Sequence, residues 1–467
     1  MFLVLAQLMK KMKKKYIYSI IAKLFPTDDE KNLHEITKDA IFECHKYLRE
    51  EYDPSVVSLR EISRFSKCVE FFKEYFKKKD EYLEKDTKDK EKLYKIKSII
   101  CSIYLCYYIR LINKGKRAEF DNRLKQILLN LVNSIIIKEK EDEKNEENLE
   151  INTEQDIKEE EIKEGSLIDN INYKDLKMDI RNQGINQFSD FLNIEEEFLI
   201  NLIELDKGIG KNSLLKENLF LLFLSVVTTI PLIIIGKPGT GKSLSAQLIY
   251  KSMKGKYSKN KFFRKYPQII QTYFQGSEST NPDDIIKLFE MAEGKYSYFE
   301  KKYGNKENKE IKKEDLPISM ILFDELGLAE KSITNPLKVL HSKLEYAGKK
   351  EGVSFVGISN YSLDAAKINR ALVLSVPNLE DKFDQLKDTV KSIVESISED
   401  LYNKQKQIFD ILSKAYFEYN LKYFIKSNFI IIYYMKILTQ INFYPNHLYQ
   451  AHVLSLSQMP AQTLMDF

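Results

Sequence analysis

A glycine-rich octapeptide is the feature that most restricts the fold of this 467-residue chain. Its sequence is GKPGTGKS, formed by Gly236, Lys237, Pro238, Gly239, Thr240, Gly241, Lys242 and Ser243. Glycines at this spacing let backbone N–H groups turn toward phosphate oxygens, where a Cβ atom would obstruct them. We expect Lys242 to reach the β- and γ-phosphates of a nucleotide and Ser243 to offer a hydroxyl to Mg²⁺. Such a loop needs a buried strand before it and a helix after it, which predicts an α/β fold.

The apolar stretch before this motif, residues 219–236, has no charged residue and allows two interpretations. A run of about 18 apolar positions is the usual threshold for a transmembrane helix. Pro231 lacks an amide hydrogen and disfavours helix at the preceding residue, so it divides the stretch. We therefore expect a buried helix over 219–229, a central strand over 232–235 and no membrane span. A membrane-anchored nucleotide-binding protein is the alternative, which fractionation of the expressed protein would test.

Two further apolar stretches end in polar residues. Residues 318–325, ISMILFDE, end in Asp324 and Glu325, and residues 353–360, VSFVGISN, end in Asn360. An Asp in this position can hold Mg²⁺, and the adjacent Glu can activate water as a general base. Asn360 could position that water, although Asn also favours turns. Because ligands bind beyond the carboxyl ends of parallel strands, we expect these side chains to meet at the octapeptide.

The pattern along the chain indicates five regions. Strands and helices alternate over 167–379, which predicts a P-loop module with a parallel sheet covered by helices on both faces. The flanking regions are an all-α region at 1–137, a charged disordered linker at 138–166, a helical lid at 380–442 and an irregular tail at 443–467. A second charged insert is expected at about 300–315, and a helix is expected to start at Asn281-Pro282.

Charge balance and cysteine content indicate which partners and which cellular compartment to expect. The 73 basic and 69 acidic side chains leave a net charge of only +4, so charge does not indicate a nucleic-acid partner. The cysteines have no metal-ligand spacing and predict buried free thiols in a reducing compartment; they are Cys44, Cys68, Cys101 and Cys106. The basic residues near the N-terminus follow the apolar ones, the reverse of a secretory signal, so we expect a cytoplasmic protein.

Three segments carry a family resemblance: PLIIIGKPGTGKS, FDELGLAEKSITNPLKVLHSKLE and VGISNYSLDAAKINRA. They resemble the AAA+ core of the mysterin family, giant RING-finger E3 ubiquitin ligases with dynein-like AAA+ modules, and the similarity covers residues 200–377. The resemblance implies binding of ATP and Mg²⁺, ATP hydrolysis, conformational change of a ring-shaped protein, and neighbouring AAA+ modules as partners. Arg370 could reach the γ-phosphate of a neighbouring module, or be an ordinary surface arginine. YDPSVVSLREISRF resembles the lid of a preceding module, with Arg60 at the sensor-2 position.

Two departures from the family pattern matter. The second lid reads KSNFIIIYYMKIL, without the usual arginine, and no Cys/His array follows. We therefore expect a fragment or a truncated relative that keeps the motor and would meet the ubiquitin machinery only through a ligase domain missing here. The intact Glu325 favours hydrolysis, whereas the missing arginine favours an alternative function, a nucleotide-binding scaffold that does not hydrolyse ATP.

Overall fold

The computed structural model describes residues 17–24, 31–52, 57–85, 90–111, 113–133, 184–303, 316–347, 352–364, 369–376 and 383–423. The predicted linker and tail lie outside these ranges, as does most of the insert predicted at 300–315. The chain divides into two compact units. The first contains Met1–Glu204, Leu214–Gly236 and Gly241–Pro377, and the second contains Leu205–Ser213, Lys237–Thr240 and Asn378–Phe467.

The first unit begins with helices, as the periodicity of the sequence predicts. They are η1 (Ala22–Leu24), α2 (Lys31–Glu51), α3 (Arg60–Tyr82), α4 (Glu91–Tyr107), η3 (Tyr108–Arg110), α5 (Lys114–Asn133) and α8 (Asp190–Leu202). A capping box starts α3: the backbone N and Oγ of Ser58 both donate to the carboxylate of Glu61, at 2.7 and 2.9 Å. The four cysteines are buried and free within these helices, as predicted.

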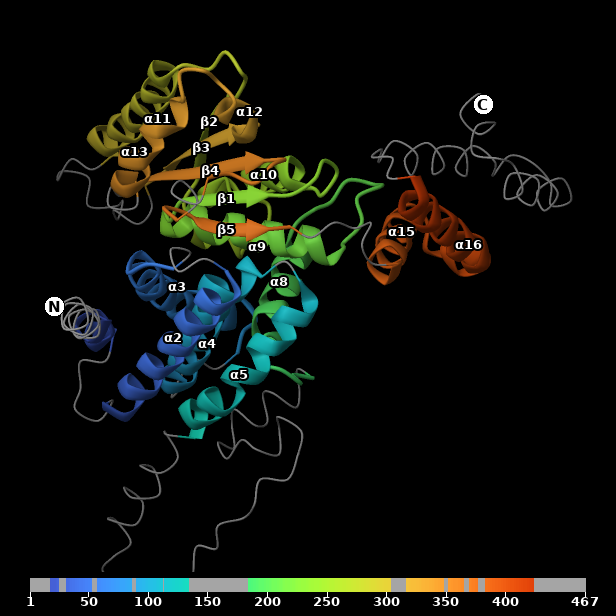
Figure 1. The fold of residues 1–467 in the computed structure, drawn as a ribbon, viewed down its shortest axis with the longest axis horizontal. Helices are drawn as coiled ribbons and strands as arrows, with labels where there is room; N and C mark the ends of the chain where they lie inside the picture. The colour runs from blue at the N-terminus through green and yellow to red at the C-terminus, as the bar shows by residue number, and fades with distance from the viewer. Residues whose placement is uncertain are drawn as a thin grey trace, which may run out of the picture. The chain divides into compact units, whose positions relative to one another are not determined.

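A five-stranded parallel sheet follows (Figure 1). Its strands are β1 (Leu232–Ile235), β2 (Ile269–Gln275), β3 (Ile318–Asp324), β4 (Val353–Ser359) and β5 (Leu372–Ser375). The strand order is β2-β3-β4-β1-β5, and each neighbouring pair is parallel. This confirms the predicted α/β module, in which β1, β3 and β4 coincide with the three apolar stretches. The edge strands β2 and β5 were not predicted individually.

Helices alternate with these strands. They are α9 (Ser213–Thr228), α10 (Lys242–Ser252), η4 (Gly255–Tyr257), η5 (Phe263–Lys265), α11 (Pro282–Tyr303), α12 (Leu326–Glu330), η7 (Pro336–Lys338) and α13 (Val339–Ala347). Helix α11 begins at Pro282 as predicted, and the Asp284 carboxylate accepts a hydrogen bond from the backbone N of Asn281 at 2.9 Å. Helices α11 and α13 pack against the sheet through a buried cluster in which the rings of Phe289 and Phe355 stack 5.8 Å apart.

The apolar stretch that resembled a membrane span is divided between two elements. Helix α9 ends at Thr228, Thr229 has a positive φ of 53°, and β1 begins three residues later. The Ser225 hydroxyl closes the turn by donating to the carbonyl of Ile230 at 2.7 Å. In the ranges given above, no helix has both the length and the apolar character needed to cross a bilayer.

Aromatic side chains join α3 to α9. The rings of Phe72 and Phe220 stack at 6.0 Å, and Tyr75 contacts both Phe220, at 5.9 Å, and Phe223, at 6.3 Å. All four side chains are fully buried, and aromatic contacts at these distances are favourable beyond the area that they bury. Figure 1 shows α2–α5 and α8 gathered beyond β5, and this helical region belongs to the same compact unit as the sheet.

The second unit contains α15 (Phe383–Ile397) and α16 (Glu399–Tyr423), with a non-helical residue, Gln405, inside α16. The two helices pack through a small buried cluster around Val394, Tyr402 and Phe409. Residues 205–213 belong to the same unit, since Asn212 Nδ2 donates to Thr389 Oγ1 at 3.3 Å. The part of the predicted lid that the structure describes is thus helical, whereas the stretch KSNFIIIYYMKIL lies outside the described residues.

Candidate functional site

The glycine-rich loop leaves the carboxyl end of β1 and leads into α10, as predicted. Gly239 and Gly241 have φ values of 83° and 78°, in the left-handed region that side chains with a Cβ rarely adopt. The Thr240 hydroxyl donates to the carbonyl of Lys237 at 2.9 Å and braces the turn. The first helical residue is Lys242, so the positive end of the α10 dipole faces the loop.

Lys242 is 5% exposed, and its Nζ donates to the carbonyl oxygen of Gly236 at 2.6 Å. Burial lowers the pKa of this lysine to about 8, although Glu325 and Asp324 act in the opposite direction. Desolvation disfavours the charged form of a lysine, and nearby carboxylates only partly restore it. An anion placed in this loop would therefore meet a cation with few competing water contacts.

Ser243 and Asp324, the two predicted magnesium ligands, lie in contact. Ser243 Oγ donates to Asp324 Oδ2 at 3.0 Å, and the other carboxylate oxygen accepts the backbone N–H of Glu325 at 2.9 Å. Among the described residues, no group of three or more His, Cys, Asp or Glu side chains could hold a metal. One hydroxyl and one carboxylate suit Mg²⁺, which keeps several waters and binds through few protein oxygens together with substrate phosphates.

Glu325 and Asn360 also meet, from the ends of β3 and β4. Asn360 Nδ2 donates to both carboxylate oxygens of Glu325, at 3.0 and 3.1 Å. The backbone of Glu325 has φ 54°, a left-handed conformation that costs a non-glycine residue free energy and is frequent where strain serves a site. Glu325 is therefore held by its amide partner beside the loop, at the edge where the sequence analysis expected it.

Arg370 is the predicted site residue that the structure does not bring to this edge. It precedes β5, so it lies at the amino end of a parallel strand, whereas Asp324 ends its strand and Glu325 and Asn360 follow theirs. Its Nε donates to the carbonyl of His341 at 3.0 Å and lies 3.6 Å from Glu345 of α13.

Arg60, from the start of α3, also pairs with Glu345. Two arginines separated by 310 positions in the sequence therefore share one carboxylate. That carboxylate belongs to a glutamate whose side chain is 43% exposed.

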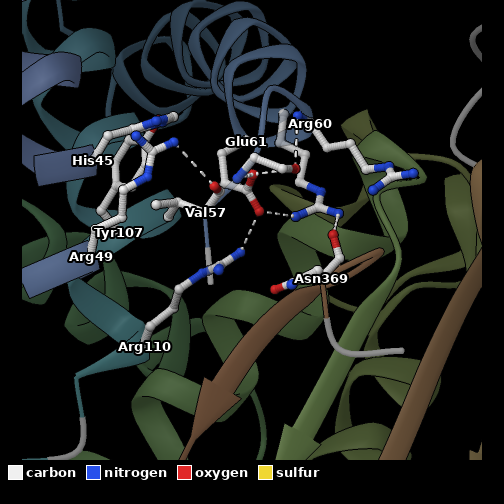
Figure 2. A network of polar contacts seen from close by, with 10 residues as sticks. His45, Arg49, Val57, Arg60, Glu61, Tyr107, Arg110 and Asn369 are labelled. Carbon is white, nitrogen blue, oxygen red and sulfur yellow. Dashed lines mark hydrogen bonds and ion pairs between the residues drawn. The ribbon is translucent and has the colours of Figure 1, made fainter. Parts of the chain in front are cut away.

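Next to these residues lies a buried ionic cluster that the sequence analysis missed (Figure 2). Glu61 Oε1 accepts from Arg64 at 3.0 Å and from Arg110 at 2.9 Å, while Arg64 also donates to the carbonyl of Asn369 at 2.7 Å. Burial raises the pKa of Glu61, but Arg110 and Arg64 outweigh this, and the pKa lies below its ordinary value. The motif SLRE, a capping box, was the available signal for Glu61; nothing local indicated its distant partners.

A family model for the AAA domain of RNF213 matches residues 208–382, the part of the chain that contains the sheet and the loop. This segment is therefore similar to the AAA domain of RNF213. The predicted resemblance to the mysterin family is thereby confirmed for this region.

Individual proteins show the same resemblance as the family model. E3 ubiquitin-protein ligase rnf213-beta of Danio rerio is 34% identical over 228 residues, 47% of this chain and 4% of that protein. E3 ubiquitin-protein ligase RNF213 of Homo sapiens is 34% identical over 186 residues, 38% of this chain and 3% of that protein. The chain thus spans only a few per cent of the length of these relatives. The structure of C. elegans PCH-2 matches 40% of the chain and 49% of that structure's chain at 14% identity, with a TM-score of 0.24.

Proposed function

We propose that the AAA+ module binds ATP with Mg²⁺ and hydrolyses it, and that turnover changes the conformation of a larger ring-shaped protein. The observation that carries the proposal is the meeting of Lys242, Ser243, Asp324, Glu325 and Asn360 at the carboxyl ends of three adjacent strands. Phosphoryl transfer depends on positioning and on charge stabilisation, and these five side chains offer a cation, metal ligands, a base and an amide.

Binding begins at residues Gly236–Ser243. The backbone N–H groups around Gly239 and Gly241 would surround the phosphates, and Lys242 would exchange the carbonyl of Gly236 for the β- and γ-phosphate oxygens. Lys237, Pro238 and Thr240 complete the loop. Mg²⁺, when bound, neutralises phosphate charge and orients the γ-phosphate. Ser243 and Asp324, already 3.0 Å apart, are the residues that would hold it.

Hydrolysis requires an activated water. Glu325 would accept a proton from this water as its oxygen attacks the γ-phosphorus, while the bond to the β–γ bridging oxygen breaks and ADP leaves. Asn360, which now contacts both oxygens of Glu325, would orient the base and the water. The carboxylate needs one oxygen free for this step, so Asn360 has to yield one of its two contacts.

Arg370 lies at the amino end of β5, whereas the nucleotide site of this module lies at the carboxyl ends of the strands. Arg370 therefore suits a role at the nucleotide site of another module. We propose that Arg370 and Arg60 together face the phosphates of a nucleotide bound by a preceding AAA+ module, in place of Glu345. In this scheme residues 1–137 form the lid of that preceding module and 138–166 a linker. Residues 167–379 form the nucleotide-binding domain, 380–442 its lid and 443–467 a tail.

The wider setting follows from the relatives. Their names describe E3 ubiquitin-protein ligases, so we propose that this motor works beside ubiquitin machinery supplied by a ligase domain elsewhere. Four buried free cysteines suit a reducing compartment, and a cytoplasmic location is proposed on that ground. No nucleic-acid partner is invoked.

A second candidate is a scaffold that binds ATP without hydrolysing it. The contact of Asn360 with both oxygens of Glu325 favours this candidate, because the carboxylate that would act as the base is already hydrogen-bonded through both oxygens.

Paired substitutions at the end of β3 distinguish the candidates. Glu325→Gln should retain Mg-ATP while phosphate release falls by about 10²–10⁴-fold, the usual contribution of a general base. Asp324→Asn should weaken Mg-ATP binding as well. Glu330→Gln, on the following helix, serves as the matched control and should match the parent. Undiminished phosphate release by Glu325→Gln would overturn the hydrolytic role, and release absent from parent and variant alike, with ATP bound, would favour the scaffold.

A further inference from the structure

A strongly basic surface segment, separate from the proposed nucleotide site, begins in the last turn of helix α10. Residues 251–265, KSMKGKYSKNKFFRK, contain seven basic side chains and no acidic one, in a chain whose 73 basic and 69 acidic side chains nearly balance. We name these residues the basic segment. Like charges at this density repel one another, so a folded segment of this composition is favoured by a nearby anion.

The basic segment has a fixed backbone. Met253, Phe262 and Phe263 are fully or almost fully buried. The backbone N of Lys254 donates to Ser258 Oγ at 2.9 Å, and Lys254 also forms a β-bridge with Gln268. The charged side chains therefore project from ordered positions, so a ligand would not have to order this backbone when it binds.

The outward side chains are hydrated ammonium groups around one tyrosine. Lys251, Lys256, Lys259 and Lys261 are exposed, and Tyr257 is 77% exposed. Lys256 Nζ lies 5.4 Å from the centre of the Tyr257 ring. Such a surface attracts anions over a distance of about 8–10 Å at ordinary ionic strength.

The surface is remote from the proposed nucleotide site. Helix α10 begins with Lys242 and runs 11 residues, so its two ends are about 16 Å apart at 1.5 Å per residue. The basic segment leads from the far end of α10 to the amino end of β2. A ligand at one place therefore needs no residue from the other.

The contacts already present indicate which anion suits this surface. Lys259 pairs with Glu204 at 2.5 Å, and Lys265 pairs with Glu81 at 2.8 Å. Lys265 also donates to the carbonyl of Lys78 at 3.2 Å. Side-chain carboxylates thus pair with the segment at two separate points.

Phosphate and lipid ligands fit less well. Arg264, whose guanidinium could match a phosphate bidentately, donates instead to the carbonyls of Ser258 and Lys259, at 2.8 and 3.3 Å. Tyr257 is the one large exposed apolar side chain within these fifteen described residues. The segment therefore lacks the successive rings that stack bases and the apolar residues that enter a bilayer.

We propose that the basic segment is a docking surface for an acidic polypeptide, a stretch of a partner protein rich in Asp and Glu. Lys256 and Lys261 would form its ion pairs in the same way that Lys259 and Lys265 use Glu204 and Glu81. The affinity is set by charge, so it should fall as salt is added.

The probe is a fluorescent poly-glutamate peptide, titrated against the full chain at low salt and followed by anisotropy. The charge reversal Lys256→Glu/Lys261→Glu should weaken binding by at least about tenfold, because it replaces two attractions with two repulsions. Lys301→Glu/Lys302→Glu, two exposed lysines on α11, makes the same change in net charge elsewhere and should bind like the parent. Unaltered thermal unfolding of each variant confirms folding.

Two results would overturn the proposal. One is equal affinity of the parent and the Lys256→Glu/Lys261→Glu variant for poly-glutamate. The other comes from parallel titrations with single-stranded DNA and with anionic phospholipid vesicles. Suppose that either one binds the parent more tightly than poly-glutamate does, and that its binding is lost in the Lys256→Glu/Lys261→Glu variant. The surface then binds that polyanion and not an acidic polypeptide.

Discussion

The sheet arranges charged side chains differently at the carboxyl ends of its strands, the carboxyl edge, and at their amino ends, the amino edge. At the carboxyl edge, Ser243, Asp324, Glu325 and Asn360 pair among themselves, and each ends or follows a strand. At the amino edge, arginines from distant segments share the carboxylates of Glu61 and Glu345. The first arrangement is dictated by short motifs, because parallel strands bring their ends together. The second depends on packing between segments about 300 residues apart, so it reports how the helical region is fixed to the module.

This contrast implies that the edges can be disturbed separately. Substitutions at the amino edge should change stability and leave ATP affinity intact, and substitutions at the carboxyl edge should do the reverse.

The largest effect is expected from Glu61→Gln. Removing one partner of a buried ionic cluster leaves uncompensated charge, here on Arg64 and Arg110, and typically costs about 3–5 kcal/mol. Urea unfolding should show this loss, whereas Glu74→Gln, at an exposed position of the same helix, should stay within about 0.5 kcal/mol of the parent. A loss below about 1 kcal/mol for Glu61→Gln would show that the cluster does not fix the helical region.

Next in size is Lys242→Ala, at the other edge. Truncating the buried cation should weaken Mg-ATP binding by at least about 100-fold, measured by calorimetry. The same measurement on Arg370→Ala should match the parent, because Arg370 lies at the amino edge. Weaker ATP binding in Arg370→Ala would contradict the separation of the edges, and retained affinity in Lys242→Ala would remove the loop from the proposed site.

A smaller effect concerns pH. The pKa of Lys242 is about 8 in the free protein because burial disfavours its charge, and bound phosphates should raise it. Above about pH 8, binding therefore requires proton uptake, and ATP affinity should fall by up to about tenfold per pH unit. Calorimetry in buffers of different ionisation enthalpy should report nearly one proton taken up at about pH 9 and little at about pH 7. The same proton count at both values would contradict the buried-lysine assignment.

The smallest effect is expected for the pair formed by Arg60 and Glu345. Their side chains are 45% and 43% exposed, and exposed ion pairs contribute at most about 1 kcal/mol. A double-mutant cycle of Arg60→Ala and Glu345→Ala in urea unfolding should give a coupling energy below that value. A larger coupling energy would mean that Glu345 helps to fix the helical region to the module. It would contradict the proposal that Arg60 can exchange Glu345 for the phosphates of a nucleotide.

The sequence predicted what local chemistry determines. The octapeptide, the acidic end of β3 and the polar end of β4 each contain their own signal within about eight residues. Strands β2 and β5 escaped individual prediction for physical reasons: β2, IIQTYFQ, mixes polar and aromatic residues as an edge strand can, and β5 has only four residues. The pairing of Arg64 with the carbonyl of Asn369 spans 305 positions, and no motif or periodicity predicts such a contact.

The packed rings of Phe72, Tyr75, Phe220 and Phe223 determine where this chain can be cut for expression. A shorter piece that begins after the helical region would keep Phe220 and Phe223 on α9 and expose to water the ring surfaces that Phe72 and Tyr75 cover. Exposed apolar patches of this kind promote aggregation. The smallest well-behaved unit for biochemistry therefore starts upstream of α3, well before the residues that contact ATP in our proposal, and protease digestion should find the same boundary.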